Sequence, residues 1–234
     1  GKTMSQNNGN IEWHDGDMPY SRVFGDHFYS RADGRAECAH VFLDGNDLPQ
    51  RWQEKPVFTI AELGFGTGLN FCETWRQWET GRPDSGRLRF VSFEKHLLGI
   101  DDIARALGAW PQLAPYREQL TAHWSKAASA FVRIDFDDTI ALELHGGEAL
   151  ECLSQWPDGA DAWFLDGFAP ARNEAMWSEE LMREVFHHTL PGGSFATYTA
   201  AGWVRRNLQA AGFTVEKRPG YAGKRDMTVG WKGG

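Results

Sequence analysis

Cysteine is scarce in this 234-residue chain, which has only Cys38, Cys72 and Cys152. The three form no C-x-x-C pair and are odd in number, which argues against a disulfide framework and against a structural zinc site. The eight histidines form no H-E-x-x-H pattern, and His187 and His188 are neighbours that would point apart on a helix. We therefore expect buried free thiols and no catalytic metal.

Long apolar runs and an excess of positive charge are also missing. No uninterrupted apolar stretch approaches the ~20 residues needed to cross a bilayer, and the N-terminus lacks the charged-then-apolar order of a signal peptide. The formal net charge is -8, which counts against a protein that grips nucleic acid with its whole surface. We expect a soluble, cytoplasmic protein that does not contact membranes.

The chain does contain enough apolar material for one large core. Hydrophobic residues make up 41% and aromatic residues 13% of the sequence, and the length suits a single domain. Residues 1–10 have no apolar pattern and are expected to be disordered or a cloning remnant. Residues 11–55 are rich in aromatics and turn residues, which predicts an extension of short strands or hairpins packed on the main domain, residues 56–234.

Strand-like apolar runs alternate with helical patterns over the main domain. The runs cover residues 57–63, 88–94, 140–145, 161–166, 194–199, 213–218 and 226–231. The helical patterns cover residues 69–79, 101–109, 147–156, 174–189 and 202–211. This alternation predicts an α/β fold with a mostly parallel, seven-stranded sheet and crossover helices on both faces. The last two strands are too close in sequence for a helical crossover, so we expect an antiparallel edge.

The first strand of the main domain leads into three glycines at alternate positions, in FTIAELGFGTGLNF (58–71). Such a loop brings backbone close to a ligand at the carboxyl end of a sheet. A phosphate-binding P-loop would need a lysine and a hydroxyl residue after the glycines, and neither follows. A dinucleotide fold would need G-x-G-x-x-G, but Gly68 comes one residue early. NAD or FAD is disfavoured by this spacing but stays open.

S-adenosylmethionine suits the loop better because it carries no phosphate. The glycines would let backbone approach its methionine and ribose parts, and Glu62 would place a carboxylate near its ammonium group. Glu94 ends the next strand, where an acid is expected to accept the ribose hydroxyls, although it could also be an ordinary strand-end carboxylate. The expected cofactor-binding residues are Glu62, Gly64, Phe65, Gly66, Thr67, Gly68, Asn70, Glu94, Lys95, Gly147, Glu148 and Asp166.

Two further positions bear on the acceptor and on the adenine ring. Gly147 stands where methyltransferase sheets often present an acid to adenine, so Glu148 or a backbone group would make that contact. Asp166 ends the fourth strand at the switch region, and Phe168 follows. A carboxylate that takes or orients the proton of an amine would free its lone pair, and Phe168 would stack on a planar base. Alternatively, Asp166 caps a turn and Phe168 belongs to the core.

Basic residues gather between Trp203 and Arg225, where six of them accompany one acid, Glu216. They are expected to contact RNA phosphates, or they form a solvated face. The six candidates are Arg205, Arg206, Lys217, Arg218, Lys224 and Arg225.

Five segments together resemble the methyltransferase domain of the MnmC family of bacterial tRNA-modifying enzymes. They are HVFLDGNDLPQRW, AELGFGTGLNF, SFEK, DAWFLDGFAPARNEAMW and PGGSFATYTAAGWVRRNLQAAGFTVEKRPGYAGKRDM. The resemblance runs from about Ile11 to the end of the chain. It implies a Rossmann-like class I fold and methyl transfer from S-adenosylmethionine to the aminomethyl nitrogen on C5 of a wobble uridine. The product would be 5-methylaminomethyl-2-thiouridine in tRNA.

The resemblance also implies roles and partners. The glycine loop would wrap the cofactor, Glu94 would hold the ribose, and Asp166 would lie against the amine of a tRNA anticodon region. Many members carry an FAD-dependent oxidase domain that strips carboxymethyl from the same nitrogen, and no such domain is present here. The chain is then a stand-alone member or part of a longer protein. Other readings are methylation of another RNA base or small amine, hydride transfer, and a non-catalytic module that docks on RNA or on an oxidase.

Overall fold

An eight-stranded sheet lies at the centre of the computed structural model, which describes residues 10–29, 33–124 and 130–234. The strand order is β10-β11-β9-β8-β4-β5-β7-β6. The parallel part comprises β4 (Val57–Leu63), β5 (Arg87–Glu94), β7 (Ile140–Gly146), β8 (Ala160–Leu165) and β9 (Thr189–Thr197). The predicted α/β class is confirmed. The expectation for residues 1–10 lies outside the described residues, apart from Asn10.

Antiparallel strands complete both edges of the sheet. At one edge β11 (Met227–Trp231) pairs with β9 and with β10 (Thr214–Arg218), which confirms the predicted antiparallel edge. At the other edge β6 (Phe131–Asp135) pairs antiparallel with β7, and it raises the strand number from the expected seven to eight. Only Val132 and Ile134 of β6 are buried, so its apolar signal in the sequence is short and weak.

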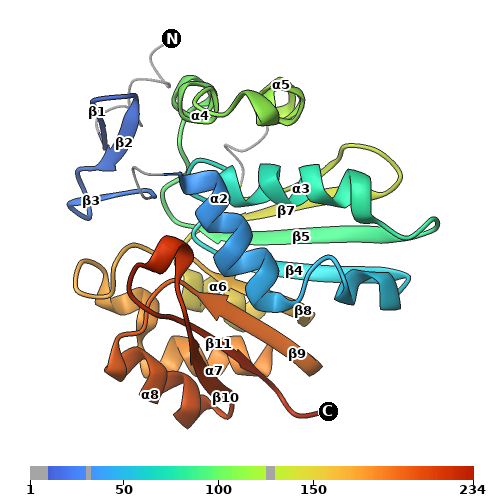
Figure 1. Ribbon diagram of the computed structural model, residues 1–234, viewed down its shortest axis with the longest axis vertical. Coiled ribbons are helices and arrows are strands. Elements are labelled where there is room, and N and C mark those ends of the chain that lie inside the picture. Colours follow the sequence, from blue (N-terminus) through green and yellow to red (C-terminus); the bar gives the residue numbers. More distant parts are fainter. Residues whose placement is uncertain (1–9, 30–32, 125–129) are drawn as a thin grey trace.

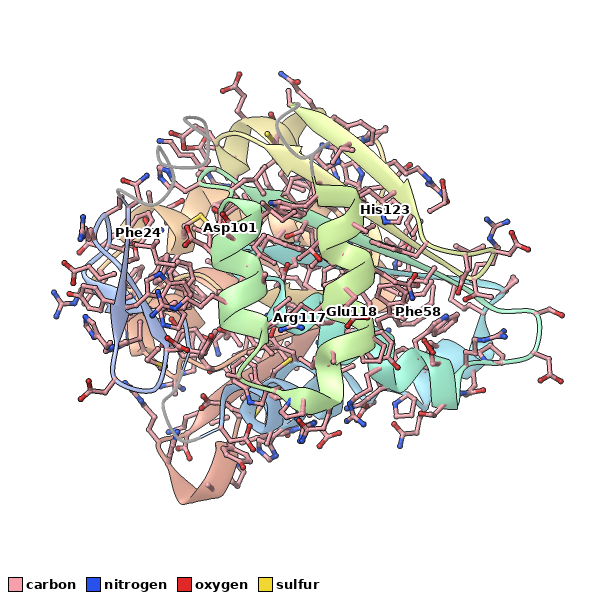
Figure 2. The ribbon with its side chains drawn as sticks, turned by 90° about the horizontal axis from the view of Figure 1, so that it is seen from above. Phe24, Phe58, Asp101, Arg117, Glu118 and His123 are labelled. Atoms are coloured by element: carbon pink, nitrogen blue, oxygen red, sulfur yellow. The ribbon has the colours of Figure 1, made fainter. Side chains whose placement is uncertain are left out.

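Helices cover both faces of the sheet (Figure 1). One face carries α2 (Gly34–Cys38), α3 (Leu69–Gly81), α4 (Ile100–Leu107) and α5 (Ala114–His123). The other carries α6 (Ala149–Gln155), α7 (Glu179–His187) and α8 (Gly202–Ala211). Figure 2 shows α4 and α5 side by side over the sheet, and α5 was not predicted. The helix expected over 174–189 is instead a 3-10 turn, Glu174–Trp177, followed by α7.

Alternation along each parallel strand builds a separate core on each face. On β4, Phe58 and Ile60 pack toward α3, whereas Ala61 and Leu63 pack toward α6 and α7. Gly212 follows α8 with φ +125°, as expected of a residue that ends a helix. No helix of the described part is both long and apolar enough to span a membrane.

The N-terminal extension is partly a small sheet and partly helical. β1 (Ile11–His14), β2 (Met18–Ser21) and β3 (Asp26–His27) form an antiparallel sheet, which confirms the predicted hairpins for this stretch. The segment HVFLDGNDLPQRW was wrongly expected to be extended. It forms a π-helical turn (Ala39–Leu43) and 3-10 turns (Asp44–Asn46 and Arg51–Glu54), because Cys38, Val41 and Phe42 are buried at helical spacing.

Two arginines fasten the extension to the main domain. Arg35 on α2 donates to the fully buried carboxylate of Glu73 on α3 at 3.3 Å. Arg51 donates to the Ser194 hydroxyl at 2.6 Å and to the carbonyl oxygen of Asp161 at 2.8 Å. The extension therefore begins beside the carboxyl ends of the parallel strands and crosses one face of the sheet to their amino ends (Figure 1).

Candidate active site

The carboxyl ends of β4, β5 and β8 open into a cavity of about 1100 Å³, which the N-terminal extension covers from the opposite side. Both candidate catalytic residues, Asp166 and Phe168, line it. Nine expected cofactor-binding residues also line it: Gly64, Phe65, Gly66, Thr67, Asn70, Glu94, Lys95, Glu148 and Asp166. The other three, Glu62, Gly68 and Gly147, do not line the cavity in the described part of the chain.

The glycine loop requires glycine at each of its three positions. Gly64, Gly66 and Gly68 have φ of +90°, +55° and +83°, in the left-handed region that other residues rarely adopt. A side chain at Gly64 would overlap the carbonyl oxygen of Asp166, and one at Gly66 would lie 3.2 Å from the Phe28 ring. The loop thus packs directly against the Asp166 loop and against the N-terminal extension.

Glu94 is held next to the glycine loop by backbone groups. Its Oε1 accepts the N–H of Gly66 and its Oε2 accepts the N–H of His96, each at 2.9 Å. Burial raises the pKa of Glu94, and these hydrogen bonds oppose the rise. The Glu94 carboxylate thus lines the cavity in a position that backbone groups fix.

Lys95 and Glu148 lie at the rim of the same cavity. Lys95 Nζ donates to Glu148 Oε1 at 2.5 Å, and both side chains are exposed. Gly147 donates its N–H to the Glu94 carbonyl at 3.2 Å and has φ +142°, so its conformation favours glycine. Because Gly147 stays behind the wall, an adenine contact in this region would fall to Glu148 or to backbone.

Glu62 and Asp166 are joined through Asn70. Asn70 Nδ2 donates to Glu62 Oε2 at 3.0 Å and to Asp166 Oδ2 at 2.6 Å, while the Ser92 hydroxyl donates to Glu62 Oε1 at 2.7 Å. Burial raises the pKa of Glu62 to about 8, and the charges of Asp166 and Glu94 add to the rise. Burial also raises the pKa of Asp166 to about 7, close to the value that suits proton exchange at neutral pH.

Aromatic rings surround Phe168. Phe24 stacks on it with centroids 4.8 Å apart and planes 27° apart, and Phe28 meets it edge-on at 5.0 Å. Asp26 Oδ2 accepts the N–H of Ala169 at 3.1 Å, which ties β3 to the loop after Asp166. Sequence reasoning placed the extension beside the sheet and missed these contacts. The aromatic richness of PYSRVFGDHFYS was the available signal.

The basic candidates divide between two places. Lys224 and Arg225 line the cavity, and Lys224 Nζ lies 3.9 Å from the carboxylate of Glu37. The four others lie on α8 and β10, and none of them borders the cavity as described: Arg205, Arg206, Lys217 and Arg218. Contact of these residues with RNA stays a prediction.

The described residues fit a ligand with the groups of S-adenosylmethionine. The glycine turns allow close backbone approach, and Glu94 places a carboxylate at the cavity wall. Tyr29 lines the cavity, and its buried hydroxyl has no hydrogen-bond partner among the described residues. The same residues contain no group of three or more His, Cys, Asp or Glu that could hold a metal ion.

Comparisons with known proteins show which family the chain resembles. Two proteins named tRNA 5-methylaminomethyl-2-thiouridine biosynthesis bifunctional protein MnmC are similar to the chain. The Methylobacillus flagellatus protein is 47% identical over 223 residues, covering 94% of this chain and 34% of that protein. The Chromohalobacter salexigens protein is 44% identical over 226 residues, covering 94% and 32%. The chain thus spans about a third of these relatives' length, and the resemblance to MnmC is confirmed.

Solved structures support the fold. A crystal structure of MNMC2 from Aquifex aeolicus matches with a TM-score of 0.75 and 23% identity, over 94% of this chain and 69% of that one. Spermidine synthase from Thermotoga maritima matches with a TM-score of 0.53 and 15% identity, over 95% and 72%. Residues 111–233 match a family model described as S-adenosyl-L-methionine-dependent methyltransferase. With the expected fold and cofactor class confirmed, the chain belongs to the S-adenosyl-L-methionine-dependent methyltransferase family.

Proposed function

We propose that this chain transfers a methyl group from S-adenosylmethionine to the aminomethyl nitrogen on C5 of the wobble uridine in tRNA, forming 5-methylaminomethyl-2-thiouridine. The observation that carries the proposal is the environment of Asp166. Its carboxylate lines the cavity beside the glycine loop, and among residues 10–29, 33–124 and 130–234 it has no cationic partner. An amine is the acceptor that such a group suits, and the names of the relatives suggest which amine.

The chain's own residues supply the remaining chemistry. When bound, S-adenosylmethionine provides an electrophilic methyl group. An aminomethyl group is an ammonium ion at neutral pH, and it becomes nucleophilic only after losing a proton. Asp166 accepts that proton through Oδ1, because Oδ2 is engaged by Asn70. Because its pKa is raised to about 7, Asp166 is partly ionised at neutral pH and basic enough to accept the proton of the ammonium group.

The cavity walls suit the remainder of a nucleotide. Phe168 and its neighbour Phe24 offer aromatic faces for a uracil ring. Lys224 and Arg225 line the cavity, so they would contact phosphates flanking an inserted base, and the basic residues of α8 and β10 would extend that contact over the surface. We further propose that an FAD-dependent oxidase, fused or separate, supplies the amine, and that the reaction occurs in the cytoplasm.

Labelled methyl transfer tests the proposal directly. The chain is incubated with S-adenosylmethionine carrying an isotope-labelled methyl group and with tRNA bearing 5-aminomethyl-2-thiouridine. The tRNA is then digested, and its nucleosides are analysed by mass spectrometry. The expected result is one labelled methyl group on the wobble nucleoside, lost in Asp166→Asn and kept in Asp138→Asn, which alters an exposed loop. Label on a different nucleoside, or none, would overturn the proposal.

A further inference from the structure

Asn70 bridges the side chains of Glu62 and Asp166, an arrangement that cofactor binding alone does not require. It lies in the first turn of α3, and its amide nitrogen donates both of its hydrogens to carboxylates, one from β4 and one from the end of β8. Ser92 on β5 donates to the second oxygen of Glu62. Four elements thus meet in one chain of hydrogen bonds that ends at Asp166 Oδ2, the oxygen next to the candidate proton acceptor.

The orientation of the Asn70 amide is fixed by this arrangement. A flipped amide would place its carbonyl oxygen against two carboxylates, and all three groups are acceptors that would repel one another. Glu62 and Asn70 are buried, so water cannot replace the lost bonds at Glu62. The amide therefore holds Asp166 Oδ2 in place and leaves Oδ1 as the oxygen available to the cavity.

We propose that Asn70 is a positioning residue that joins Glu62 and Asp166 into one unit, with a single proton held on Glu62 and Asp166 left ionised to accept the proton of the amine. This inference rests on the proposed function, because it assumes an amine acceptor. With the proton on Glu62 Oε1, the Ser92 hydroxyl accepts from Glu62 instead of donating to it, because a hydroxyl can do either.

The groups that face Asp166 agree with one shared proton. The charges of Glu37 on α2 and Glu94 on β5 raise its pKa, while the Asn70 hydrogen bond lowers it. Glu62 is fully buried and does not line the cavity as described, whereas Asp166 lines it, so the charged form is costlier at Glu62 and the proton is held there. The charge of Asp166 also raises the pKa of the Cys38 thiol and of the Tyr198 hydroxyl. The Tyr198 hydroxyl donates to the carbonyl oxygen of Gly167.

The proton balance of the step is simple. An N–H bond of the substrate ammonium breaks, its electron pair stays on nitrogen, and the proton passes to Asp166 Oδ1. The nitrogen lone pair would then form the bond to the methyl carbon as the sulfur–methyl bond of the cofactor breaks, its electron pair staying on sulfur to leave a neutral thioether, and the nitrogen would become a secondary ammonium. Asp166 returns its proton to water when the product leaves, and Glu62 remains protonated throughout.

The pH dependence of Asn70→Ala separates positioning from a structural role. Loss of the amide raises the pKa of Asp166, so the single-turnover rate at pH 6.5 should fall about tenfold, the effect of one hydrogen bond to a charged group. At pH 9 the variant should approach the wild-type rate. Thr80→Ala, on the exposed end of the same helix, is the matched control and should match the wild type at every pH. An equal loss at all pH values would overturn the inference.

A titration without turnover keeps the inference testable if the proposed function fails. Carbon-13 NMR of aspartate-labelled protein follows the carboxyl carbon of Asp166, assigned by its absence in Asp166→Asn. The expected result is a higher midpoint in Asn70→Ala, with cofactor binding and the unfolding temperature measured alongside. An unchanged midpoint in a folded variant would overturn the inference, whereas absent methyl transfer by the wild type would overturn only the proposed function.

Discussion

Replacing Glu62 by glutamine removes an ionisable group from the centre of the molecule without changing its shape. The side-chain amide introduced by Glu62→Gln can accept from Asn70 and donate to the Ser92 hydroxyl, so both contacts survive. What disappears is the cost of ionising a fully buried carboxyl. Glu62→Gln should therefore be more stable than the wild type, and the difference should grow with pH.

The size of the difference follows from the pKa of Glu62. Below the ordinary value of 4.5 the group is protonated in the folded and unfolded chains, and the two proteins differ little. Between 4.5 and about 8 only the unfolded chain ionises, so wild-type stability falls by about 1.36 kcal/mol per pH unit. Above pH 8 the accumulated difference reaches at most about 5 kcal/mol, and water entry would reduce it to a few kcal/mol.

Urea unfolding at pH 5, 7 and 9, followed by tryptophan fluorescence, measures this difference. Glu118→Gln serves as the control because it removes the same charge from the exposed surface of α5 (Figure 2). The gain in unfolding free energy of Glu62→Gln over the wild type should be small at pH 5 and largest at pH 9. A gain that is equal at pH 5 and pH 9 would refute the assignment of a raised pKa to Glu62.

Three other substitutions test the site. Gly64→Ala forces a left-handed φ on alanine, which costs about 1–2 kcal/mol, and its methyl group would overlap the carbonyl oxygen of Asp166. Calorimetry should therefore show a lower unfolding temperature and a loss of cofactor binding. Unchanged binding would contradict this. Asp166→Asn should lower kcat about 10²–10⁴-fold and abolish the rate increase around pH 7, whereas a full rate would exclude proton transfer to Asp166. Phe168→Ala should raise KM for tRNA about tenfold with a smaller change in kcat, and the reverse split would argue against base stacking.

The fold class was predictable because parallel strands are long apolar runs separated by helical patterns. The strands and helices that sequence reasoning missed, β6 and α5, have weaker patterns. In β6 every second residue is exposed, and α5 buries only Tyr116 and Leu120. The helical turns of residues 39–54 were missed because turn residues such as Gly45 and Pro49 dominate the segment, whereas its helicity depends on tertiary burial.

The sequence allowed most residues of the candidate site to be predicted, but not how their side chains are arranged. The glycine loop, Glu94 and Asp166 meet at the cavity because carboxyl ends of neighbouring parallel strands adjoin. Glu62 was expected to approach the ligand, but it lies on the same side of β4 as Phe58 and Ile60 and points under α3. Asn70 consequently stands between Glu62 and the cavity. Strand alternation was the signal that could have revealed this.

The contacts of the N-terminal extension with the cavity could not be predicted from the spacing of sequence motifs. Phe24 and Asp26 reach the Asp166 loop across more than a hundred residues of sequence, and only tertiary packing brings them together. The aromatic and acidic residues of this stretch line the cavity on the side of Asp166 and Phe168. That side is more acidic than the sequence suggested, because Glu37 also faces it.

A competition between two tRNAs tests the central claim most directly. One carries a wobble uridine with the aminomethyl group and the other carries the carboxymethylaminomethyl group, in equal amounts with labelled S-adenosylmethionine. The carboxylates of Asp166 and Glu37, which line the cavity, would favour an ammonium and repel a second carboxylate. Label is expected on the aminomethyl nucleoside alone. Label shared equally between the two, or found on neither, would contradict that claim.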